Sequence, residues 1–405
     1  MTVYIGIDWS EQKHDICYVK EDGQVLRTLQ IKHSMEGFHD LDKRRQELGI
    51  EARDCVVGLE TAHNQLADYL WDCGYPDIYI LPPKAVKSAQ GRFRQSGAKD
   101  DPWDARLIAD MLRTDQKRYS LWRPDSLLTR QIRSSVRMVL HLTRELVRTK
   151  NRLRAVLLRY YPAATNLFSR LDSPISLAFL RQYPTPQQAA SLNFEEFSQF
   201  LRSHHHTQRA GWVRSFNQLK EPYPLSDPQI GAIYMPQAMT LVELLSVLVR
   251  HKELWLKDPT RLYENHPDRH IYASLPAAGT LLEPALLAKL GDDRQRFPSP
   301  KVLQAVAGTS PVTNRSGKRK TVYFRRSCDH EFRYIVQQWA KLSLDASPWA
   351  EAYFRSVLPN CKTTNDAIRR LANRWLEILW RLWQDRKPYD QLLHLSMHTA
   401  RSSSR

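Results

Sequence analysis

Cysteine is scarce in this chain of 405 residues, and its placement argues against a structural role for the thiols. The sequence contains five cysteines, with no Cys-x-x-Cys pair and no regular spacing that would suggest a disulfide framework. We therefore expect reduced thiols in a cytosolic protein. The five are Cys17, Cys55, Cys73, Cys328 and Cys361.

Secretory and membrane-spanning signals are also missing from the pattern. The chain opens with MTVYIGIDWS, which reaches a charged residue at once and lacks the apolar stretch of a signal peptide. We find no apolar run close to the ~20 residues that a bilayer-spanning helix needs. The sequence therefore predicts a soluble, cytoplasmic protein with no membrane partner.

Acidic residues are few relative to basic ones. The chain has 43 Asp and Glu against 60 Lys and Arg, so its formal net charge is +17. This excess favours a polyanionic partner, nucleic acid above all, over a membrane surface or simple solubility. Hydrophobic residues make up 42% of the chain, enough to form buried cores, and the length predicts two or three domains.

Residues 1–118 alternate strand and helix patterns, as is typical of an α/β domain. TVYIGID alternates apolar with small or polar residues, and KHDICYVKEDGQVLRTLQI predicts two strands joined at Asp22-Gly23. DCVVGLE and DIYILPP predict further strands, and SMEGFHDLDKRRQELG and NQLADYLWDCGY predict helices. We therefore expect a hairpin at the front of the domain and crossover connections after it.

Residues 119–265 predict a coiled coil that encloses a helical insert at about 162–227. The long helix is expected over 128–160, with residues 238–258 returning antiparallel to it. Apolar residues recur every seven positions in the first helix, at Ile132, Val139, Leu146, Leu153 and Tyr160. The heptad spacing predicts that these two helices pair and mediate assembly into a homo-oligomer.

The same long helix is strongly cationic on its other faces. Glu145 is the one acid expected to oppose these charges, which favours contact with phosphates or a protein over a merely solvated face. In the insert, the histidines of SHHH at 203–206 predict a loop rather than a metal site. The cations are Arg130, Arg133, Arg137, Arg144, Arg148, Lys150, Arg152, Arg154 and Arg159.

Residues 266–390 predict a mostly helical C-terminal domain. SLPAAGTLLEPALLAKLGD contains a turn between two helices, similar to the helix–hairpin–helix elements that bind a nucleic-acid backbone. Residues 391–405 end in HTARSSSR and predict a flexible tail.

Asp100, Asp101 and Asp104 in GAKDDPWDARLIAD, residues 97–110, allow two interpretations. Asp101 before Pro102 is typical of a helix N-cap with proline at the first helical position, and Asp104 suits the first turn. The same spacing places Asp101 and Asp104 on one helix face, where they could both bind a metal ion. Taken alone, the segment favours the capping role, although the two roles are compatible.

Two further carboxylates end predicted strands of the α/β domain. Asp8 lies on the face opposite Val3, Ile5 and Ile7, and Glu60 ends another strand. If those strands are neighbours, Asp8 and Glu60 lie side by side at one edge of the sheet. Converging carboxylates repel one another unless a cation neutralises them, and hard oxygen ligands suit Mg²⁺. A basic protein with such a site would suit phosphodiester chemistry.

Four segments resemble the N-terminal domain of DEDD-type insertion-sequence transposases. They are YIGIDWSEQKHDICYV, GLETAHNQLADYLWDCGY, ILPPKAVKSAQG and KDDPWDARLIADML. The resemblance implies an α/β domain of ribonuclease H fold, like that of the junction resolvase RuvC, then a long coiled coil and a mostly helical transposase domain. It also implies that Asp8, Glu60, Asp101 and Asp104 form the catalytic, Mg²⁺-binding DEDD set, with Asp100 as the alternative to Asp101.

The C-terminal half is similar to the second signature of that family, the serine transposase domain of bridge-RNA-guided recombinases. The match runs through LPAAGTLLEPALLAKLGDDRQRFPSPKVLQAVAGTSPVTNRSGKRKTVYFRRSCDHEFRYIVQQWA. It implies that Ser316 is the nucleophile that attacks DNA, with Ser310 and Ser327 as lesser candidates. It also implies phosphate contacts from a cationic group comprising Lys318, Arg319, Lys320, Arg325 and Arg326.

The resemblance implies partners as well as chemistry. They are donor and target DNA, a structured guide RNA and further copies of the chain in a dimer or tetramer, in a bacterial cytoplasm with the protein associated with the nucleoid. Two other functions fit the residues: a metal-dependent, structure-selective nuclease that resolves DNA junctions without Ser316, and a non-catalytic nucleic-acid-binding scaffold whose carboxylates are structural caps.

Overall fold

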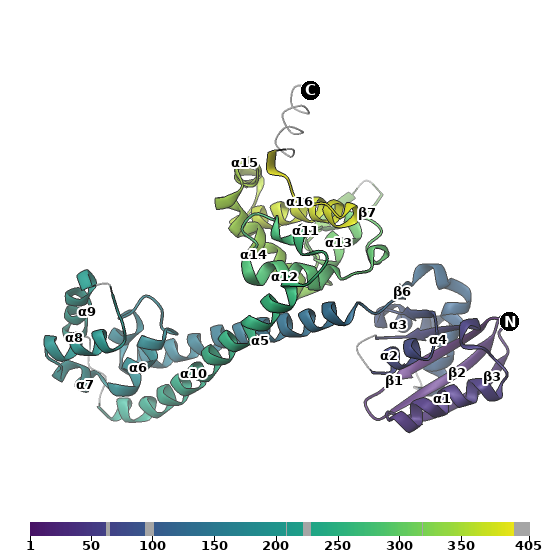
Figure 1. Ribbon diagram of the computed structural model, residues 1–405, viewed down its shortest axis with the longest axis horizontal. Coiled ribbons are helices and arrows are strands. Elements are labelled where there is room, and N and C mark those ends of the chain that lie inside the picture. Colours follow the sequence, from purple (N-terminus) through teal and green to yellow (C-terminus); the bar gives the residue numbers. More distant parts are fainter. Residues whose placement is uncertain (62–64, 94–100, 208, 222–227, 318, 393–405) are drawn as a thin grey trace. The chain divides into compact units, whose positions relative to one another are not determined.

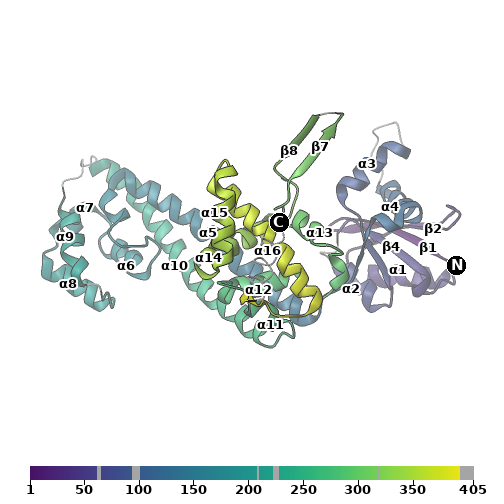
Figure 2. The same cartoon turned by 90° about the horizontal axis from the view of Figure 1, so that it is seen from above.

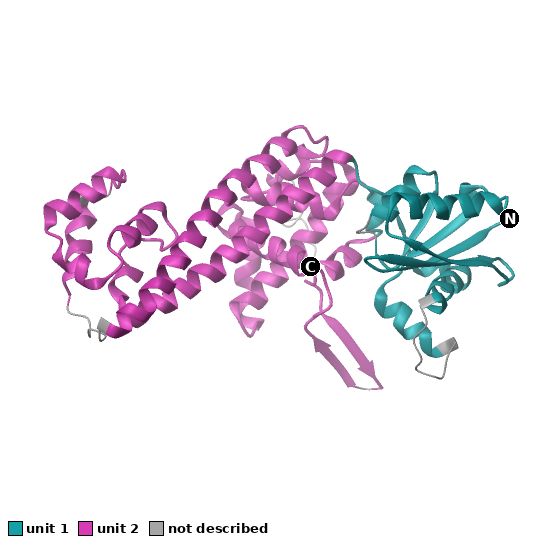
Figure 3. Ribbon diagram, turned by 90° about the horizontal axis from the view of Figure 1, so that it is seen from below, with its two compact units in different colours: residues 1–126, 293–298 teal, residues 127–292, 299–405 magenta. Residues whose placement is uncertain are grey.

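The computed structural model describes most of the chain, and Figures 1 and 2 label its helices and strands. By their contacts the residues divide into two compact units, which Figure 3 colours separately. Unit 1 comprises Met1–Ser126 with Asp293–Pro298, and unit 2 comprises Leu127–Asp292 with Ser299–Arg405. The described residues are 1–61, 65–93, 101–207, 209–221, 228–317 and 319–392.

Unit 1 is built on a six-stranded sheet in the order β3-β2-β1-β4-β5-β6. The first three strands pair antiparallel, as the two predicted hairpin strands require, whereas β4 and β5 run parallel to β1. The sequence did not predict the short strand β6, which pairs antiparallel with β5. The strands are β1 Val3–Trp9, β2 Lys13–Lys20, β3 Val25–Lys32, β4 Cys55–Leu59, β5 Asp77–Ile80 and β6 Ser120–Trp122.

Helices cover both faces of this sheet. On one face, α1 (Met35–Glu47) and α2 (Gln65–Asp72) enclose a core that includes Ile5 and Ile7. On the other, α3 (Pro83–Phe93) and α4 (Asp101–Asp115) close a second core around Tyr4. Successive strand residues point to opposite faces, so Asp8 shares the α4 face with Tyr4. The N-terminal unit is therefore a three-layered domain, and the predicted α/β class is confirmed.

Unit 2 begins with two long helices that run side by side, α5 (Leu127–Tyr160) and α10 (Pro228–Glu264) (Figure 1). Their antiparallel direction follows from their ends: Leu153 packs near Val242, whereas Thr129 bonds to His266 just beyond the end of α10. The five heptad positions of α5 are all buried. The predicted helix pair is confirmed, and its apolar seam is covered within one chain.

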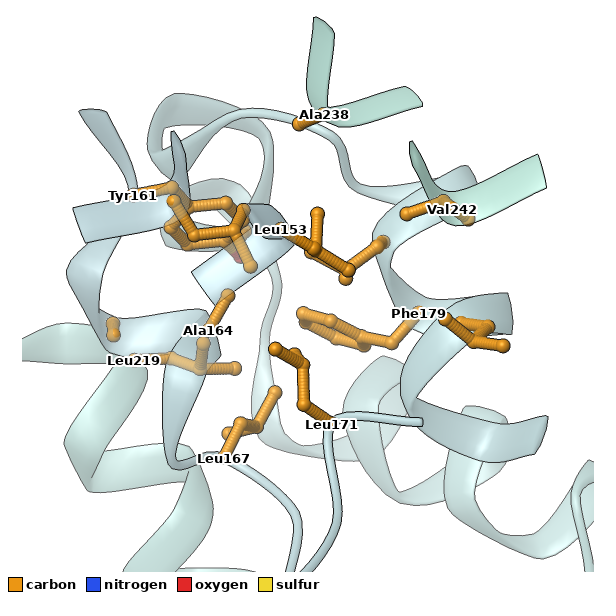
Figure 4. Packing of buried hydrophobic residues seen from close by; sticks show 14 of the residues in the cluster. Leu153, Tyr161, Ala164, Leu167, Leu171, Phe179, Leu219, Ala238 and Val242 are labelled. Carbon is orange, nitrogen blue, oxygen red and sulfur yellow. The ribbon is translucent and has the colours of Figure 1, made fainter. Parts of the chain in front are cut away.

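The insert between these helices forms a core with their adjoining ends. Figure 4 shows Leu153 of α5 and Ala238 and Val242 of α10 beside the insert residues Leu171 and Phe179. Leu153, Ala238 and Val242 are fully buried there. The insert elements are η3 Pro162–Thr165, α6 Pro174–Gln182, α7 Pro186–Ser191, α8 Phe194–Ser203, η4 Arg209–Gly211 and α9 Trp212–Lys220.

The C-terminal helices pack around tryptophan. The ring of Trp375 lies 4.8 Å from that of Trp339 and 5.0 Å from that of Trp349, measured between centroids. Its indole nitrogen donates to Ser343 Oγ at 2.9 Å, so this large side chain is buried without an unsatisfied donor. The helices are α11 Arg269–Ala273, α12 Gly279–Leu290, α13 Pro300–Val306, α14 His330–Ala346, α15 Pro348–Val357 and α16 Thr364–Asp385.

The sequence analysis missed two features of unit 2. The C-terminal region contains a β-hairpin, β7 (Val312–Ser316) with β8 (Arg319–Tyr323), that projects from the helices of unit 2 in Figure 2. In addition, one stretch of α10 is long and apolar enough to cross a membrane, by length and composition alone. The prediction that the sequence has no apolar run of this length was therefore wrong. Ala238 and Val242 of α10 are buried in the insert core, although only 17% of the apolar window is buried.

Candidate active site

Asp8 and Glu60 lie at equivalent positions on neighbouring strands. β1 and β4 are parallel, with Gly6 opposite Gly58 and Ile7 opposite Leu59, and each carboxylate follows directly after the last of these pairs. Both side chains are half-buried. The carboxyl ends of parallel strands meet at one edge of a sheet, so the predicted pairing of these strands is confirmed.

Helix α4 lies on the Asp8 face and runs antiparallel to β1. Its middle passes so close to the strand that a Cβ added to Gly6 would lie 1.9 Å from the carbonyl oxygen of Ala105. Its last turn is at the opposite end of the strand, where Arg113 contacts the turn at Gly23. The N-terminal end of α4 is therefore at the same end of β1 as Asp8.

This orientation brings a third predicted residue to the same side of the sheet. Asp104 lies in the first turn of α4, is only 8% exposed, and its Oδ1 accepts a hydrogen bond from Gln90 Nε2 at 3.1 Å. Asp101 was predicted to cap the helix and Pro102 to be its first residue, but the helix begins at Asp101 itself. Pro102 still falls in the first turn, where proline is tolerated. The side chain of Asp101, and all of Asp100, lie outside the described residues.

The chemistry of these side chains suits a hard divalent cation, since all are carboxylates. Within the part of the chain that the structure describes, however, no three His, Cys, Asp or Glu side chains are grouped closely enough to hold a metal ion. Asp100 and the side chain of Asp101, one of which the resemblance adds to this group, lie outside that part.

Sequence reasoning missed one acid next to this group. Asp15 is the cross-strand partner of Asp8 in the β1–β2 ladder, so the two side chains share a face. It is 5% exposed and accepts a hydrogen bond from Gln30 Nε2 at 2.9 Å. The hairpin register between TVYIGIDW and KHDICYVK is the signal that would have placed it beside Asp8.

Ser316 ends strand β7 at the tip of the hairpin. Its partner across the ribbon is Arg319, and Gly317 begins the two-residue connection with φ of +55°. Such a left-handed conformation is the one that short hairpin turns demand and that glycine adopts without strain. The Ser-Gly pair thus exposes the serine hydroxyl at the end of a strand.

The predicted phosphate-binding cations differ in their surroundings. Arg319 and Lys320 are exposed on β8, Arg326 is exposed after it, and Lys318 lies outside the described residues. Arg325 instead donates to the backbone carbonyls of Ser310 and Pro311, at 3.2 and 3.5 Å. Arg325 therefore ties the two ends of the hairpin together.

The two lesser serine candidates lie at the root of this hairpin. Ser310 is half-buried between α13 and β7, and Ser327 is exposed between β8 and α14. Neither side chain is at the tip of the ribbon, where Ser316 is.

The cationic face of α5 is more balanced than its own sequence indicated. Arg144 pairs with Glu331 at 3.2 Å, and Lys150 pairs with the buried Asp172 at 3.5 Å. These acids come from distant parts of the chain, so the expectation that Glu145 alone opposes the cations was wrong. In the SHHH segment, His206 Nδ1 accepts a bond from Trp212 Nε1 at 3.0 Å, which is consistent with a structural loop.

Two family models match the chain, one over each of the regions just described. A model described as Transposase, the DEDD transposase of IS110, matches residues 5–162. A second, described as Transposase IS116/IS110/IS902 family, matches residues 269–355. The chain belongs to the IS110/IS116 family of insertion-sequence transposases. Transposases of this family act on DNA, and the DEDD class implies dependence on a divalent metal.

Full-length relatives agree with this assignment to the IS110/IS116 family. The "Mini-circle putative transposase for IS117" of Streptomyces coelicolor is 29% identical over 404 residues, covering 96% of each chain. The "Insertion element IS900 uncharacterized 42 kDa protein" of Mycobacterium paratuberculosis is 24% identical over 399 residues, covering 96% of this chain and 97% of its own. Similarity at nearly full length means that both regions occur together, in the same order, in these relatives.

Proposed function

We propose that this transposase is a DNA recombinase that cuts and rejoins strands through a covalent bond between Ser316 and DNA phosphorus. The observation that carries the proposal is the joint match to two models of one family. The first matched range contains Asp8, Glu60, Asp101 and Asp104, and the second contains Ser316. The exposed position of Ser316 at a hairpin tip supports it, because a nucleophile must reach the DNA backbone.

The proposed step is a transesterification that balances without water. Ser316 Oγ forms a bond to phosphorus while the bond from phosphorus to a deoxyribose oxygen breaks. The serine hydroxyl gives its proton to a base, and the departing oxygen takes up a proton. Attack by the deoxyribose hydroxyl of another strand then reverses the step, restores serine and joins the DNA. The bond energy is conserved, so no oxidant or other co-reactant is needed.

We propose that Asp8, Glu60, Asp101 and Asp104 hold the divalent metal, Mg²⁺. When bound, such an ion neutralises phosphate charge and lowers the pKa of an attacking hydroxyl. The support is the common side of the sheet on which Asp8, Glu60 and Asp104 lie. Calorimetric titration with MgCl₂ should detect binding that Asp8→Asn weakens strongly, while the exposed acid Asp72 provides the matched Asp72→Asn control.

We also propose that a structured non-coding RNA guides target choice and that the protein acts as a dimer or tetramer. A net charge of +17 suits binding to more than one nucleic-acid chain. An RNA guide would leave sequence recognition to base pairing. The protein would then contact mainly the backbone of both nucleic acids.

A denaturing-gel assay tests the nucleophile. The probe is a labelled duplex that spans the junction of the element with its flanking DNA, incubated with MgCl₂ and RNA transcribed from the neighbouring non-coding DNA. We expect a protein–DNA adduct with the unmodified protein and none with Ser316→Ala. Ser310→Ala and Ser327→Ala are the controls and should retain the adduct.

Other outcomes point to other functions. An adduct that persists in Ser316→Ala would show that another residue is the nucleophile. Metal-dependent cleavage without any adduct would indicate a structure-selective nuclease. Binding without cleavage, unchanged in Asp8→Ala, would indicate a non-catalytic scaffold.

A further inference from the structure

The β7–β8 ribbon presents two faces of different chemistry. Cross-strand partners share a face, and successive pairs alternate between faces. One face therefore carries Ser316 with Arg319 at the tip. The other face carries Arg315 with its partner Lys320 one step further from the tip. Cations occur on both faces, but a single one lies directly opposite the serine.

The ribbon is also exposed on both faces. Every residue of β7 is exposed, and in β8 Val322 is 56% and Tyr323 54% exposed although both are apolar or aromatic. An isolated two-stranded ribbon is marginally stable in water, so this one needs a partner. Residues 312–323 contain four Lys or Arg and no acid. Within the described part of the chain, Arg315, Arg319 and Lys320 form no ion pair. These charges suit a polyanionic partner.

The root of the ribbon is fixed, so its faces have defined directions relative to the helices of unit 2. The ring of Phe324 lies under two guanidinium groups, 4.5 Å from that of Arg333 and 4.9 Å from that of Arg369. Arg325 adds its bond to the Ser310 carbonyl oxygen on the opposite strand side. These contacts come immediately after β8 and hold the hairpin where it leaves the helices.

We propose that Arg319 is a catalytic residue that holds the phosphate attacked by Ser316, whereas Lys320 and Arg315 only attract the DNA backbone. This inference rests on the proposed serine chemistry. It assigns the stabilisation of the phosphate's negative charge to Arg319 alone among several neighbouring cations. Cβ atoms of directly opposed residues lie about 5 Å apart, so the guanidinium and the hydroxyl can reach one phosphate together. The guanidinium donates two parallel hydrogen bonds to the non-bridging oxygens, where negative charge grows as the Oγ–P bond forms.

Residues on the opposite face cannot make this contact. When the Ser316 face lies against the attacked phosphate, Arg315 and Lys320 point away from it. Their contribution is long-range attraction, which strengthens binding at low salt and does not change the barrier of the chemical step. Arg319 only donates hydrogen bonds to the phosphate, so the balance of the transesterification is unaltered.

The experiment compares variants of the full-length protein with the junction duplex and RNA described above. At saturating protein, we expect Arg319→Ala to slow formation of the Ser316 adduct by about 100-fold or more, the usual effect of removing one oxyanion donor. Arg319→Lys should recover part of the rate, because it restores charge without the planar fork. Lys320→Ala and Arg315→Ala should lower the saturated rate far less than Arg319→Ala does, while weakening binding a few-fold and reducing its salt dependence.

Each result has a defined meaning. An Arg319→Ala rate equal to that of the unmodified protein overturns the inference, as does an equal loss of rate in Lys320→Ala. Arg319→Gln, which keeps a polar side chain of similar length, provides a second variant, and thermal melting of each protein separates loss of rate from loss of folding. If an adduct persists in Ser316→Ala, the proposed function fails instead, whatever Arg319→Ala shows.

Discussion

At the scale of single residues, His14 couples the stability of unit 1 to pH. The ring is fully buried on β2, stacks near Trp9 and shares a hydrogen bond with His33, with Nε2 and Nδ1 2.9 Å apart. Burial, together with the neighbouring His33, lowers the pKa of His14 from 6.5 to about 4. The folded protein therefore keeps this ring neutral at a pH where the unfolded chain protonates it.

The consequence is a loss of stability in mild acid. The unfolded state binds the proton first as pH falls below 6.5, so stability is complete above that value and declines towards about pH 4. Between about pH 7 and about pH 5 we expect the free energy of unfolding to fall by about 2 kcal/mol through this group. Denaturant titrations at both pH values should show a smaller fall in His14→Gln.

The matched control for this prediction is the exposed His39. His39→Gln should lose as much stability in acid as the unmodified protein. An unchanged acid loss in His14→Gln would show that other groups dominate the pH dependence.

At the scale of elements, the packing of α4 on β1 determines the position of Asp104 relative to Asp8. Gly6 has no Cβ, which lets the helix backbone approach the strand and places Asp104 at the Asp8 end of the sheet. A methyl group there would overlap the carbonyl oxygen of Ala105 and lie 2.5 Å from the nitrogen of Ala109. Backbone atoms cannot move aside as a flexible side chain can, so the whole helix would have to shift.

Gly6→Ala should therefore impair both folding and activity. We expect a loss of about 1–3 kcal/mol in the free energy of unfolding, or more, as for other overpacked cores. Adduct formation should fall as well, because the shifted helix carries Asp104 away from Asp8. Gly91→Ala is the control: this helical site has nothing within 4 Å of the added methyl, and the change should stabilise by about 0.5 kcal/mol. Equal stability of the two variants would contradict the close packing.

At the scale of the whole molecule, the heptad seam of α5 is not exposed for contact with a second copy of the chain. That seam is buried by α10 and the insert within the chain. The outer side of α10 has a second apolar stripe with spacings of three and seven residues, at Leu244, Val247 and Leu254, each about half exposed. This spacing is that of a helix that pairs with another helix.

We expect this stripe to contact a second copy of the chain. Replacing Leu244 and Leu254 together with glutamate should weaken self-association about 100-fold, since each buried leucine contributes about 1.5 kcal/mol or more. Analytical ultracentrifugation measures the effect. Val213→Glu, at an exposed apolar site in the insert, should leave association unchanged. A double variant that associates as strongly as the unmodified protein would exclude the stripe as the interface.

Features encoded by consecutive residues could be predicted from the sequence. The heptads of α5 specify its length and buried side, because helical periodicity is local. The positions of Asp8 and Glu60 near the carboxyl ends of β1 and β4 follow from the pattern of apolar residues along each strand. The family motifs in which these residues and Ser316 lie are likewise continuous segments.

Features that depend on strand register or on packing between elements could not. The acids that neutralise α5 depend on helix packing, and the placement of Arg319 opposite Ser316 depends on the register of the hairpin. A shift of one residue in register would exchange Arg319 for Lys320 on the serine face without altering a single letter of the sequence. The sequence by itself determined which chemical groups are present and which elements carry them. Only the tertiary structure decided which groups share a face, because that depends on contacts whose energies come from the whole fold.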